Sequence, residues 1–304
     1  MKGMSHETLL SQTVLNLKES ATLKMSQMAR ELKAKGHDVI SLSIGEPDFD
    51  TPAFINEAAK QALDDGYTHY TPVPGLLELR EAVCTKLKRD NNLDFEPKNI
   101  VVSNGAKQTI YNLCQALLNP GDEVIIFTPY WVSYIEIVKL AGGVPICLFA
   151  GVESDYKVNP ADVAAAITDK TKFILYSSPS NPTGSVYTKK ELKAIADVIA
   201  PHEHVYVVSD EIYEHIVFDG VHESIAQFEN MRPRTIVVNG MSKGFAMTGW
   251  RLGYMAAPEV VAKACTKIQG QVTSGASAFG QKAAAVALLK DPKVTQDMLS
   301  LIHI

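Results

Sequence analysis

Short apolar runs alternate with amphipathic stretches through most of this chain. Turn residues bound the apolar runs, and the stretches between them repeat apolar positions with the period of a helix. The runs lie within residues 99–108, 122–131, 172–184, 204–213 and 234–243, and the helical stretches occupy 109–118, 132–143 and 189–200. Strands separated by helices form βαβ units, so we predict an α/β fold with a mostly parallel sheet.

Each predicted strand ends in polar or glycine-containing residues. These tips are Ser103-Asn104-Gly105, Pro129-Tyr130-Trp131, Asn181, Asp210 and Ser242-Lys243. Ligands of open α/β sheets bind outside the carboxyl ends of the strands. We therefore expect the five tips to line one crevice.

The end of the sequence has an unusual pattern. Residues 279–304 predict a helix, a break at Asp291-Pro292-Lys293, and the start of a second helix. This second helix has no glycine or asparagine stop signal and runs into apolar residues. We expect the chain to be cut short relative to its parent.

The composition is that of a globular protein, with 46% hydrophobic and 21% charged residues among 304. The length allows one large domain with a smaller companion. The formal net charge is −5 and no basic stripe is present, which argues against a nucleic-acid partner.

The cysteines and the apolar segments indicate the compartment. Cys84, Cys114, Cys147 and Cys265 are scattered, which predicts buried, reduced thiols and no metal site. The N-terminus lacks the continuous apolar core of a secretory signal, and no run of 18 apolar residues exists. We predict a cytoplasmic protein that does not enter a membrane.

The stretch "NGMSKGFAMTGWRLGY", residues 239–254, places Lys243 among small residues and Arg251 eight positions later. One interpretation is a glycine-rich loop with two solvated cations. The other is a site for an aldehyde that carries a phosphate, because an amine forms a Schiff base with an aldehyde and an arginine binds a phosphate. Pyridoxal phosphate is such a molecule.

The pyridoxal ring acts as an electron sink when its nitrogen stays protonated, and a nearby carboxylate favours that state. Asp210 follows an apolar run and suits this role, although it could also cap a helix starting at 211. Tyr213 and Asn181 offer donors for the phenolic oxygen of the ring. The motif "SNPTG" that contains Asn181 is alternatively a plain turn.

The phosphate requires backbone N–H groups at the start of a helix together with a cation. Gly105, Ala106 and Lys107 open a predicted helix, and Arg251 supplies the charge. Trp131 could stack on the ring or simply fill the core.

Seven motifs now combine into a family resemblance that covers residues from about 14 to the end. The chain resembles the pyridoxal-phosphate-dependent aminotransferases of class I/II, fold type I, and is most similar to bacterial aspartate aminotransferases. The motifs, in chain order, are "SIGEPDFDTP", "HYTPVPGLLELREA", "SNGAKQ", "TPYWVSY", "SNPTG", "SDEIYEHI" and "SKGFAMTGWRLGY".

The resemblance implies a role for each matching residue. Lys243 resembles the lysine that holds the cofactor covalently and then moves a proton at the substrate Cα, and Asp210 resembles the partner of the ring nitrogen. Tyr213 joins them as a catalytic residue. Tyr213 and Asn181 match the residues that bond the phenolic oxygen, and Trp131 matches the stacking ring.

The remaining matches concern the phosphate. Gly105, Ala106 and Arg251 match the phosphate cup. Many relatives place a serine where this chain has Gly240, and Ser242 is a possible substitute.

Other matches concern the substrate and the partner subunit. Gly45, Trp131 and Asn181 match contacts to the substrate carboxylate. Lys107, beside the cofactor, is placed for the distal carboxylate of aspartate or glutamate, unless it is a solvated lysine. Tyr70 resembles a tyrosine that reaches the phosphate of the neighbouring subunit, which implies a homodimer with shared active sites.

The family also implies a domain plan. Residues 1–52 would form an N-terminal arm and part of a small domain, residues 53–290 a large cofactor-binding domain with helices on both faces of its sheet, and residues 291–304 the start of an interdomain helix. The rest of the small domain, with an arginine for the substrate α-carboxylate, would be missing. We therefore expect cofactor binding with slow transamination between an amino acid and a 2-oxo acid.

Other functions remain open at this point. The same cofactor serves aromatic, prephenate and alanine aminotransferases and C–S lyases that catalyse β-elimination. A transcriptional regulator can be built on the same fold, but few residues precede "SIGEPDFDTP" for a DNA-binding head. An inactive fragment of a longer enzyme is the third alternative.

Overall fold

The computed structural model describes residues 9–41 and 45–302. Its centre is a seven-stranded sheet with the order β1-β7-β6-β5-β4-β2-β3. The strands are β1 (Ile100–Ser103), β2 (Glu123–Thr128), β3 (Val144–Phe149), β4 (Thr171–Ser177), β5 (Tyr206–Asp210), β6 (Thr235–Gly240) and β7 (Gly253–Ala256). The predicted α/β architecture is confirmed, and all five predicted apolar runs form strands.

The sheet is mostly parallel, as predicted. The pairs β2·β3, β2·β4, β4·β5 and β5·β6 are parallel, whereas β7 pairs antiparallel with both β6 and β1. No crossover helix separates β6 from β7, so the chain doubles back and β7 runs the opposite way. Neither β7 nor the edge strand β3 is among the strands that the apolar pattern predicts.

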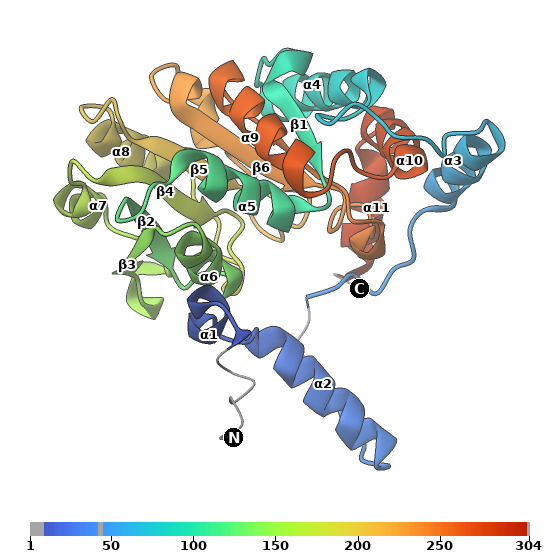
Figure 1. The fold of residues 1–304 in the computed structure, drawn as a ribbon, viewed down its shortest axis with the longest axis horizontal. Helices are drawn as coiled ribbons and strands as arrows, with labels where there is room; N and C mark the ends of the chain where they lie inside the picture. Colours follow the sequence, from blue (N-terminus) through green and yellow to red (C-terminus); the bar gives the residue numbers. More distant parts are fainter. Residues whose placement is uncertain (1–8, 42–44, 303–304) are drawn as a thin grey trace.

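Eleven helices lie in the described ranges, and most of them pack around the sheet (Figure 1). They are α1 (Gln12–Asn16), α2 (Ala21–Ala34), α3 (Ala53–Asp64), α4 (Leu77–Asn91), α5 (Ala106–Leu117), α6 (Ser133–Leu140), α7 (Pro160–Ala166), α8 (Lys189–Ile199), α9 (Glu259–Val272), α10 (Ala278–Leu289) and α11 (Lys293–Ile302). Short 3-10 turns occupy Pro97–Asn99, Val152–Ser154, Ile225–Gln227, Arg232–Arg234 and Thr248–Trp250. The predicted helix, proline break and second helix at the end of the chain are confirmed as α10 and α11.

The core divides between the two faces of the sheet. On one face α5, α6 and α9 pack against alternate strand residues such as Val101 and Ile236. On the other face α3, α4 and α10 cover the β1 side, and α8 covers the β4 side. Within β1, Val101 faces one layer while Ile100 and Val102 face the other, which is the two-residue alternation of a strand buried on both sides.

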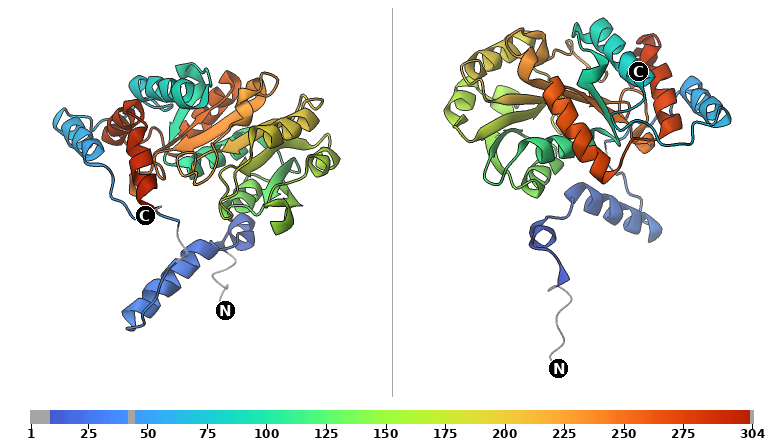
Figure 2. Two further views of the ribbon diagram at one scale, coloured as in Figure 1. Left: turned by 180° about the vertical axis from the view of Figure 1, so that it is seen from behind. Right: turned by 45° about the horizontal axis from the view of Figure 1, so that its top comes forward.

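The N-terminal helices α1 and α2 extend away from the body of the molecule (Figure 2). Several of their apolar side chains are exposed, among them Leu15, Leu23 and Met28.

The prediction that the cysteines are buried is partly wrong. Cys114 and Cys265 are buried free thiols, but Cys147 is exposed because β3 is an edge strand. Among the helices of residues 9–41 and 45–302, none is both long and apolar enough to cross a bilayer.

Candidate active site

The carboxyl ends of five strands meet at one edge of the sheet. Strands β2, β4, β5 and β6 are mutually parallel through their pairings, and β1 shares their direction because two antiparallel pairings separate it from β6. All five predicted tips therefore lie at this edge. Asp210 ends β5 and Lys243 follows β6, which is the neighbouring strand.

Asp210 is a buried carboxylate with few donors around it. The Tyr134 hydroxyl donates to its Oδ2 at 2.6 Å, and the backbone N–H of Ile212 donates to its Oδ1 at 3.3 Å. Burial raises the pKa of Asp210 from 3.8 to about 6, although the Tyr134 hydrogen bond opposes this rise. A cation beside this carboxylate would favour its charged form.

Residues 212–215 form a turn and no helix starts at 211, so the alternative role of Asp210 as a helix cap is wrong. Tyr134, the strongest partner of Asp210, is a residue that the sequence analysis missed. It lies on α6 and is fully buried, and its place in an apolar helical stretch gives only the signal of a core residue.

Asp210 gives a testable pH dependence of the stability of the cofactor-free protein. Since its folded pKa of about 6 exceeds the ordinary 3.8, the folded state binds more protons than the unfolded state between these values. Its contribution to stability is therefore lost as the pH rises through this window, by roughly 2 kcal/mol between pH 4.5 and 7. In urea unfolding, Asp210→Asn should gain stability relative to the parent from pH 4.5 to 7; a constant difference would contradict the prediction.

Tyr213 and Asn181 lie together beside Lys243. Asn181 Nδ2 donates to the Tyr213 hydroxyl at 3.4 Å, and Lys243 Nζ lies 5.4 Å from the centroid of the Tyr213 ring. A Cβ on Gly45 would lie 3.7 Å from the same hydroxyl. The structure therefore brings these four predicted residues into one cluster.

Lys243 is a half-buried amine on the loop that follows β6. Its Nζ donates to the backbone oxygen of Gly45. Burial lowers the pKa of Lys243, with a further decrease from Arg251, while Glu46 and Asp210 act in the opposite direction. A lower pKa leaves more of the amine neutral, and the neutral form is the nucleophile that attacks a carbonyl carbon.

An anion-binding arrangement lies at the start of α5. Gly105 caps this helix with φ of 85°, and a Cβ at Gly105 would lie only 2.5 Å from Arg251 Nη2. Arg251 donates from Nη1 to the Thr248 oxygen at 3.0 Å and from Nη2 to the Asn104 oxygen at 3.4 Å. The free N–H groups of a helix start with a guanidinium beside them fit a phosphate.

Gly253 permits this arrangement. A Cβ at Gly253 would lie 2.3 Å from the Ala106 nitrogen and 2.6 Å from the Gly105 carbonyl carbon, both rigid backbone atoms. We predict that Gly253→Ala displaces the start of α5 and lowers stability by about 1–3 kcal/mol. Thermal unfolding would measure this loss, with Gly249→Ala as the control because its Cβ meets no atom within 4 Å. Equal melting temperatures for both variants would contradict the prediction.

Lys107 and Trp131 contact each other at the rim. Lys107 Nζ lies 4.8 Å from the centroid of the Trp131 ring, and burial together with Arg251 lowers the pKa of Lys107. Trp131 is only half-buried and packs edge-on against Tyr134, with centroids 5.6 Å apart. Lys107 is therefore not an isolated surface lysine, and Trp131 is not a fully buried core residue.

The other predicted residues occupy different surroundings. Tyr70 is 98% exposed, and Ser242 is buried at the start of the Lys243 loop. A Cβ at Gly240 would lie 2.8 Å from the Gly253 Cα and from the Leu252 oxygen. A side chain at position 240 would therefore require β7 to shift.

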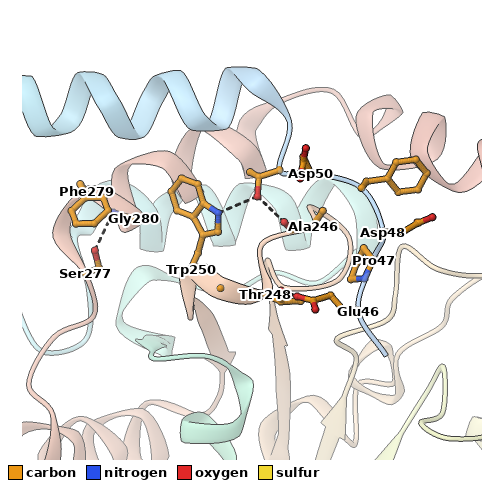
Figure 3. A pocket seen from close by; sticks show the side chains of 13 residues that line it. Glu46, Pro47, Asp48, Asp50, Ala246, Thr248, Trp250, Ser277, Phe279 and Gly280 are labelled. Carbon is orange, nitrogen blue, oxygen red and sulfur yellow. Dashed lines mark hydrogen bonds between the residues drawn. The ribbon is translucent and has the colours of Figure 1, made fainter. Parts of the chain in front are cut away.

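Two cavities border the Lys243 loop. The larger, of about 660 Å³, lies between residues 46–51 and 246–250 and α10, where Trp250 Nε1 donates to Thr51 Oγ1 at 3.0 Å (Figure 3). Thr51 Oγ1 in turn donates to the Ala246 oxygen at 2.6 Å, so the segment 46–51 supports the loop that contains Lys243. The smaller cavity, of about 250 Å³, includes Lys243 itself.

The smaller cavity is the better candidate for a substrate pocket because it contains the amine. Tyr213 and Gly45 line it together with Lys243. Its other wall includes side chains that the sequence analysis missed, namely His215, Ile216, Thr295, Met298 and Leu299. In the described ranges no group of three histidine, cysteine or acidic side chains is arranged to hold a metal ion.

Comparisons with known proteins agree with this geometry. Residues 37–302 match the family described as Aminotransferase class I and II. The chain is 48% identical to an aspartate/prephenate aminotransferase of Cereibacter sphaeroides over 92% of this chain and 70% of that protein. It is also 48% identical to an aspartate aminotransferase of Geobacillus stearothermophilus, over 91% of this chain and 71% of that one.

A solved structure of Thermus thermophilus aspartate aminotransferase with maleate superposes with a TM-score of 0.92 and 43% identity, covering 96% of this chain and 75% of that chain. The seven-stranded sheet and the sequence therefore lead to the same family. The chain belongs to the class I and II aminotransferases, enzymes that depend on pyridoxal phosphate and move an amino group between an amino acid and a 2-oxo acid.

Proposed function

We propose that this chain transfers an amino group between aspartate or glutamate and a 2-oxo acid, using pyridoxal 5′-phosphate held at Lys243. The observation that carries the proposal is the pairing of a half-buried amine, Lys243, with a buried carboxylate, Asp210, at the ends of adjacent strands. An anion-binding helix start lies beside them. Amine, carboxylate and anion site match the aldehyde, ring nitrogen and phosphate of the cofactor.

The residues present fit this cofactor. Lys243 would bind it covalently, and Asp210 would face its ring nitrogen. The backbone from Gly105 to Ala106, with Arg251 and the nearby Ser242, would hold the phosphate; Lys107 borders this site. The groups assigned to the ring itself are Trp131, for stacking, and Tyr213 and Asn181, for the phenolic oxygen.

The bound cofactor supplies an electron sink for the electrons of a broken Cα–H bond. Asp210 keeps the proton on the ring nitrogen by its charge, and the Tyr134 hydroxyl orients the carboxylate for this contact. Lys243, as a neutral amine, would move the proton from the substrate Cα to C4′ of the cofactor. The lowered pKa of Lys243 favours that neutral form.

The substrate class follows from the rim of the site and from the relatives. Lys107 offers a cation for a distal carboxylate, and Gly45, Asn181 and Trp131 would contact the α-carboxylate. Two of the relatives named above are aspartate and aspartate/prephenate aminotransferases. We therefore place aspartate and glutamate first among the donors, and prephenate is a second acceptor to test.

The proposal includes a cytoplasmic homodimer with shared active sites. Tyr70 is 98% exposed although it is a large aromatic residue. An exposed ring of this kind is typical of an interface. In the dimer it would reach the phosphate site of the partner subunit.

The test is a half-reaction followed by absorbance. The purified chain is loaded with pyridoxal phosphate, and aspartate, glutamate, alanine or phenylalanine is added in excess. Loss of the bound-cofactor band with the two dicarboxylic donors, and weaker loss in Lys107→Ala, would support the proposal. Equal loss with all four donors would contradict the substrate class, and a lyase would be recognised by release of ammonia and pyruvate from cysteine or a β-substituted alanine.

A further inference from the structure

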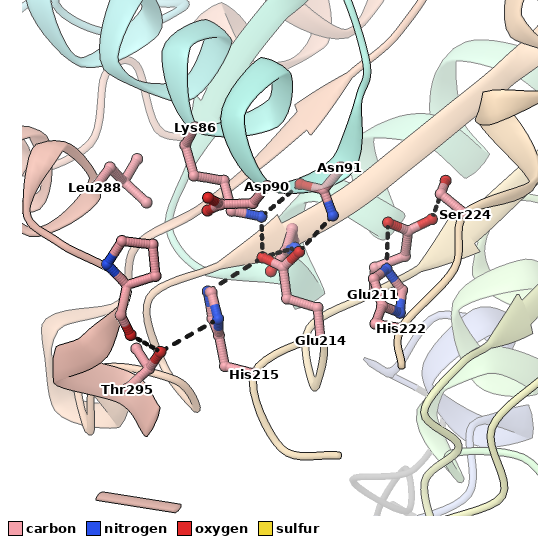
Figure 4. Close-up of polar contacts among 12 residues, drawn as sticks. Lys86, Asp90, Asn91, Glu211, Glu214, His215, His222, Ser224, Leu288 and Thr295 are labelled. Atoms are coloured by element: carbon pink, nitrogen blue, oxygen red, sulfur yellow. Dashed lines mark hydrogen bonds and ion pairs between the residues drawn. The ribbon is translucent and has the colours of Figure 1, made fainter. Parts of the chain in front are cut away.

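A second buried carboxylate, Glu214, lies four residues after Asp210 and outside the proposed cofactor contacts (Figure 4). Its Oε1 accepts hydrogen bonds from Lys86 Nζ and from Asn239 Nδ2, the latter at 2.8 Å. Its Oε2 accepts from Asn91 Nδ2 at 2.8 Å. His215 Nε2 lies 3.3 Å from Oε1, so four side chains surround one carboxylate.

These partners come from separate parts of the fold. Lys86 and Asn91 belong to α4, whereas Asn239 belongs to β6 and precedes Lys243 by four residues. The Asn239 Oδ1 accepts from the Gly240 N–H at 2.7 Å, which orients the amide so that its nitrogen donates to Glu214. Glu214 thus joins the segment after β5 to the end of β6.

The charge of Glu214 is needed for this arrangement. The Lys86 side chain is 1% exposed and that of Glu214 is 5% exposed, so the ion pair is withdrawn from water. Lys86 and the neighbouring histidines hold the pKa of Glu214 well below its ordinary value despite burial. Only the carboxylate can accept from all of these donors, because a neutral acid or amide would turn a hydrogen toward one of them.

The same turn makes a second contact with the lysine loop. A Cβ on Gly244, the residue after Lys243, would lie 2.5 Å from the His215 Cδ2. The His215 ring also packs edge-on against Phe245, with centroids 5.6 Å apart. Glu214 contacts the adjacent ring atom, Nε2, so the same edge of the imidazole touches both the carboxylate and the loop.

We infer that Glu214 is a positioning residue that fixes the spacing between Asp210 and Lys243 by tying the turn after β5 to β6. The inference rests on the proposed cofactor function. A rigid ring must reach the carboxylate at one end and the amine at the other, so small errors in this spacing are costly. Lys86 holds the carboxylate charged, and Asn239 transmits its position to the lysine strand.

Glu211 provides the matched control, because it is also a fully buried carboxylate on this turn. It accepts from Ser209 Oγ at 2.8 Å and Ser224 Oγ at 2.6 Å, and it pairs with His222 at 3.0 Å. None of these partners lies on β6. Glu211→Gln therefore removes a buried charge without breaking the side-chain link between the strands.

The experiment compares Glu214→Gln, Asn239→Ala and Glu211→Gln with the parent by two readouts. The first is the Kd for pyridoxal phosphate, taken from the absorbance band that requires Lys243. The second, on the cofactor-free protein, is the pH midpoint for modification of Lys243 by an amine reagent, resolved by peptide mass. Glu46, Asp210, Tyr213 and Arg251, the groups that face Lys243, remain in every variant.

We expect Glu214→Gln and Asn239→Ala to weaken cofactor binding at least tenfold and to raise the Lys243 midpoint, because a loosened loop admits water to the amine. Glu211→Gln should leave the midpoint unchanged. In Glu214→Gln the buried Lys86 ammonium has lost its carboxylate partner. The double variant Lys86→Met/Glu214→Gln removes this ammonium, so its melting temperature should be higher than that of Glu214→Gln, while its affinity for the cofactor should remain low.

Three results would overturn the inference. The first is an unchanged Kd and an unchanged Lys243 midpoint in Glu214→Gln. The second is a midpoint shift in Glu211→Gln as large as that in Glu214→Gln. The third is recovery of cofactor affinity in the double variant, because recovery would mean that only the buried charge of Lys86 mattered. If the parent shows no Lys243-dependent band, the proposed function fails. The midpoint measurement then decides the positioning role by itself, because it uses no cofactor.

Discussion

Replacing Lys243 with alanine is expected to abolish the bound-cofactor absorbance band and to lower amino-group transfer by about 10⁴-fold or more. The variant loses both the covalent attachment and the base that moves the substrate proton. The fold should persist, because Lys243 is half-buried on a loop and its side chain makes a single hydrogen bond, to the Gly45 oxygen, among those described.

Lys243→Arg is the matched control for this prediction. Its guanidinium keeps the positive charge beside Asp210 and Glu46 but does not form the covalent bond. Both variants should therefore lose the band, while circular dichroism and melting temperature stay close to those of the parent. A band of normal intensity in Lys243→Ala would assign the cofactor to another amine.

The second large effect is expected for Asp210→Asn, with amino-group transfer reduced on the order of 10³-fold. The amide is the same size as the carboxylate but carries no charge to hold a proton on the ring nitrogen. An opposite charge shifts a neighbouring pKa by about 1–3, and each unit of pKa changes the ratio of the protonated to the deprotonated form roughly tenfold. Single-turnover decay of the cofactor band with aspartate measures the loss.

Tyr134→Phe separates orientation from charge. It removes the 2.6 Å hydrogen bond to Asp210 but leaves the carboxylate in place, so its effect should be about tenfold. A loss in Tyr134→Phe as large as that in Asp210→Asn would mean that the hydroxyl, and not the charge, supports the reaction. Unchanged turnover in Asp210→Asn would remove Asp210 from the mechanism.

Much of the site could be predicted because its residues occur in short, contiguous motifs. Lys243 and Arg251 lie eight positions apart in one segment, and Gly105 and Ala106 are separated from the end of β1 only by Asn104. The rule that strand ends line a crevice then placed Asp210 and Asn181 beside them. Turn chemistry and apolar periodicity act over a few residues, so they can be interpreted without a fold.

Other features have no local signal. Tyr134 shares the apolar pattern of α6, and only the packing of α6 against the sheet and α5 brings its hydroxyl to Asp210. Lys86 and Glu214 are separated by 128 positions, and in the sequence each is an ordinary charged residue. The strand β7 was also not predicted, since its four residues, Gly253–Ala256, are too short a run to indicate a strand or its direction.

The sequence by itself determined the α/β class, the strand tips, the family and most of the residues proposed for the cofactor. Only the tertiary structure decided the strand order, the Tyr134 contact, the Glu214 link between β5 and β6, and the raised pKa of Asp210. The physical reason is the range of the forces. Secondary structure follows from neighbours along the chain, whereas desolvation and buried hydrogen bonds exist only after distant segments have packed together.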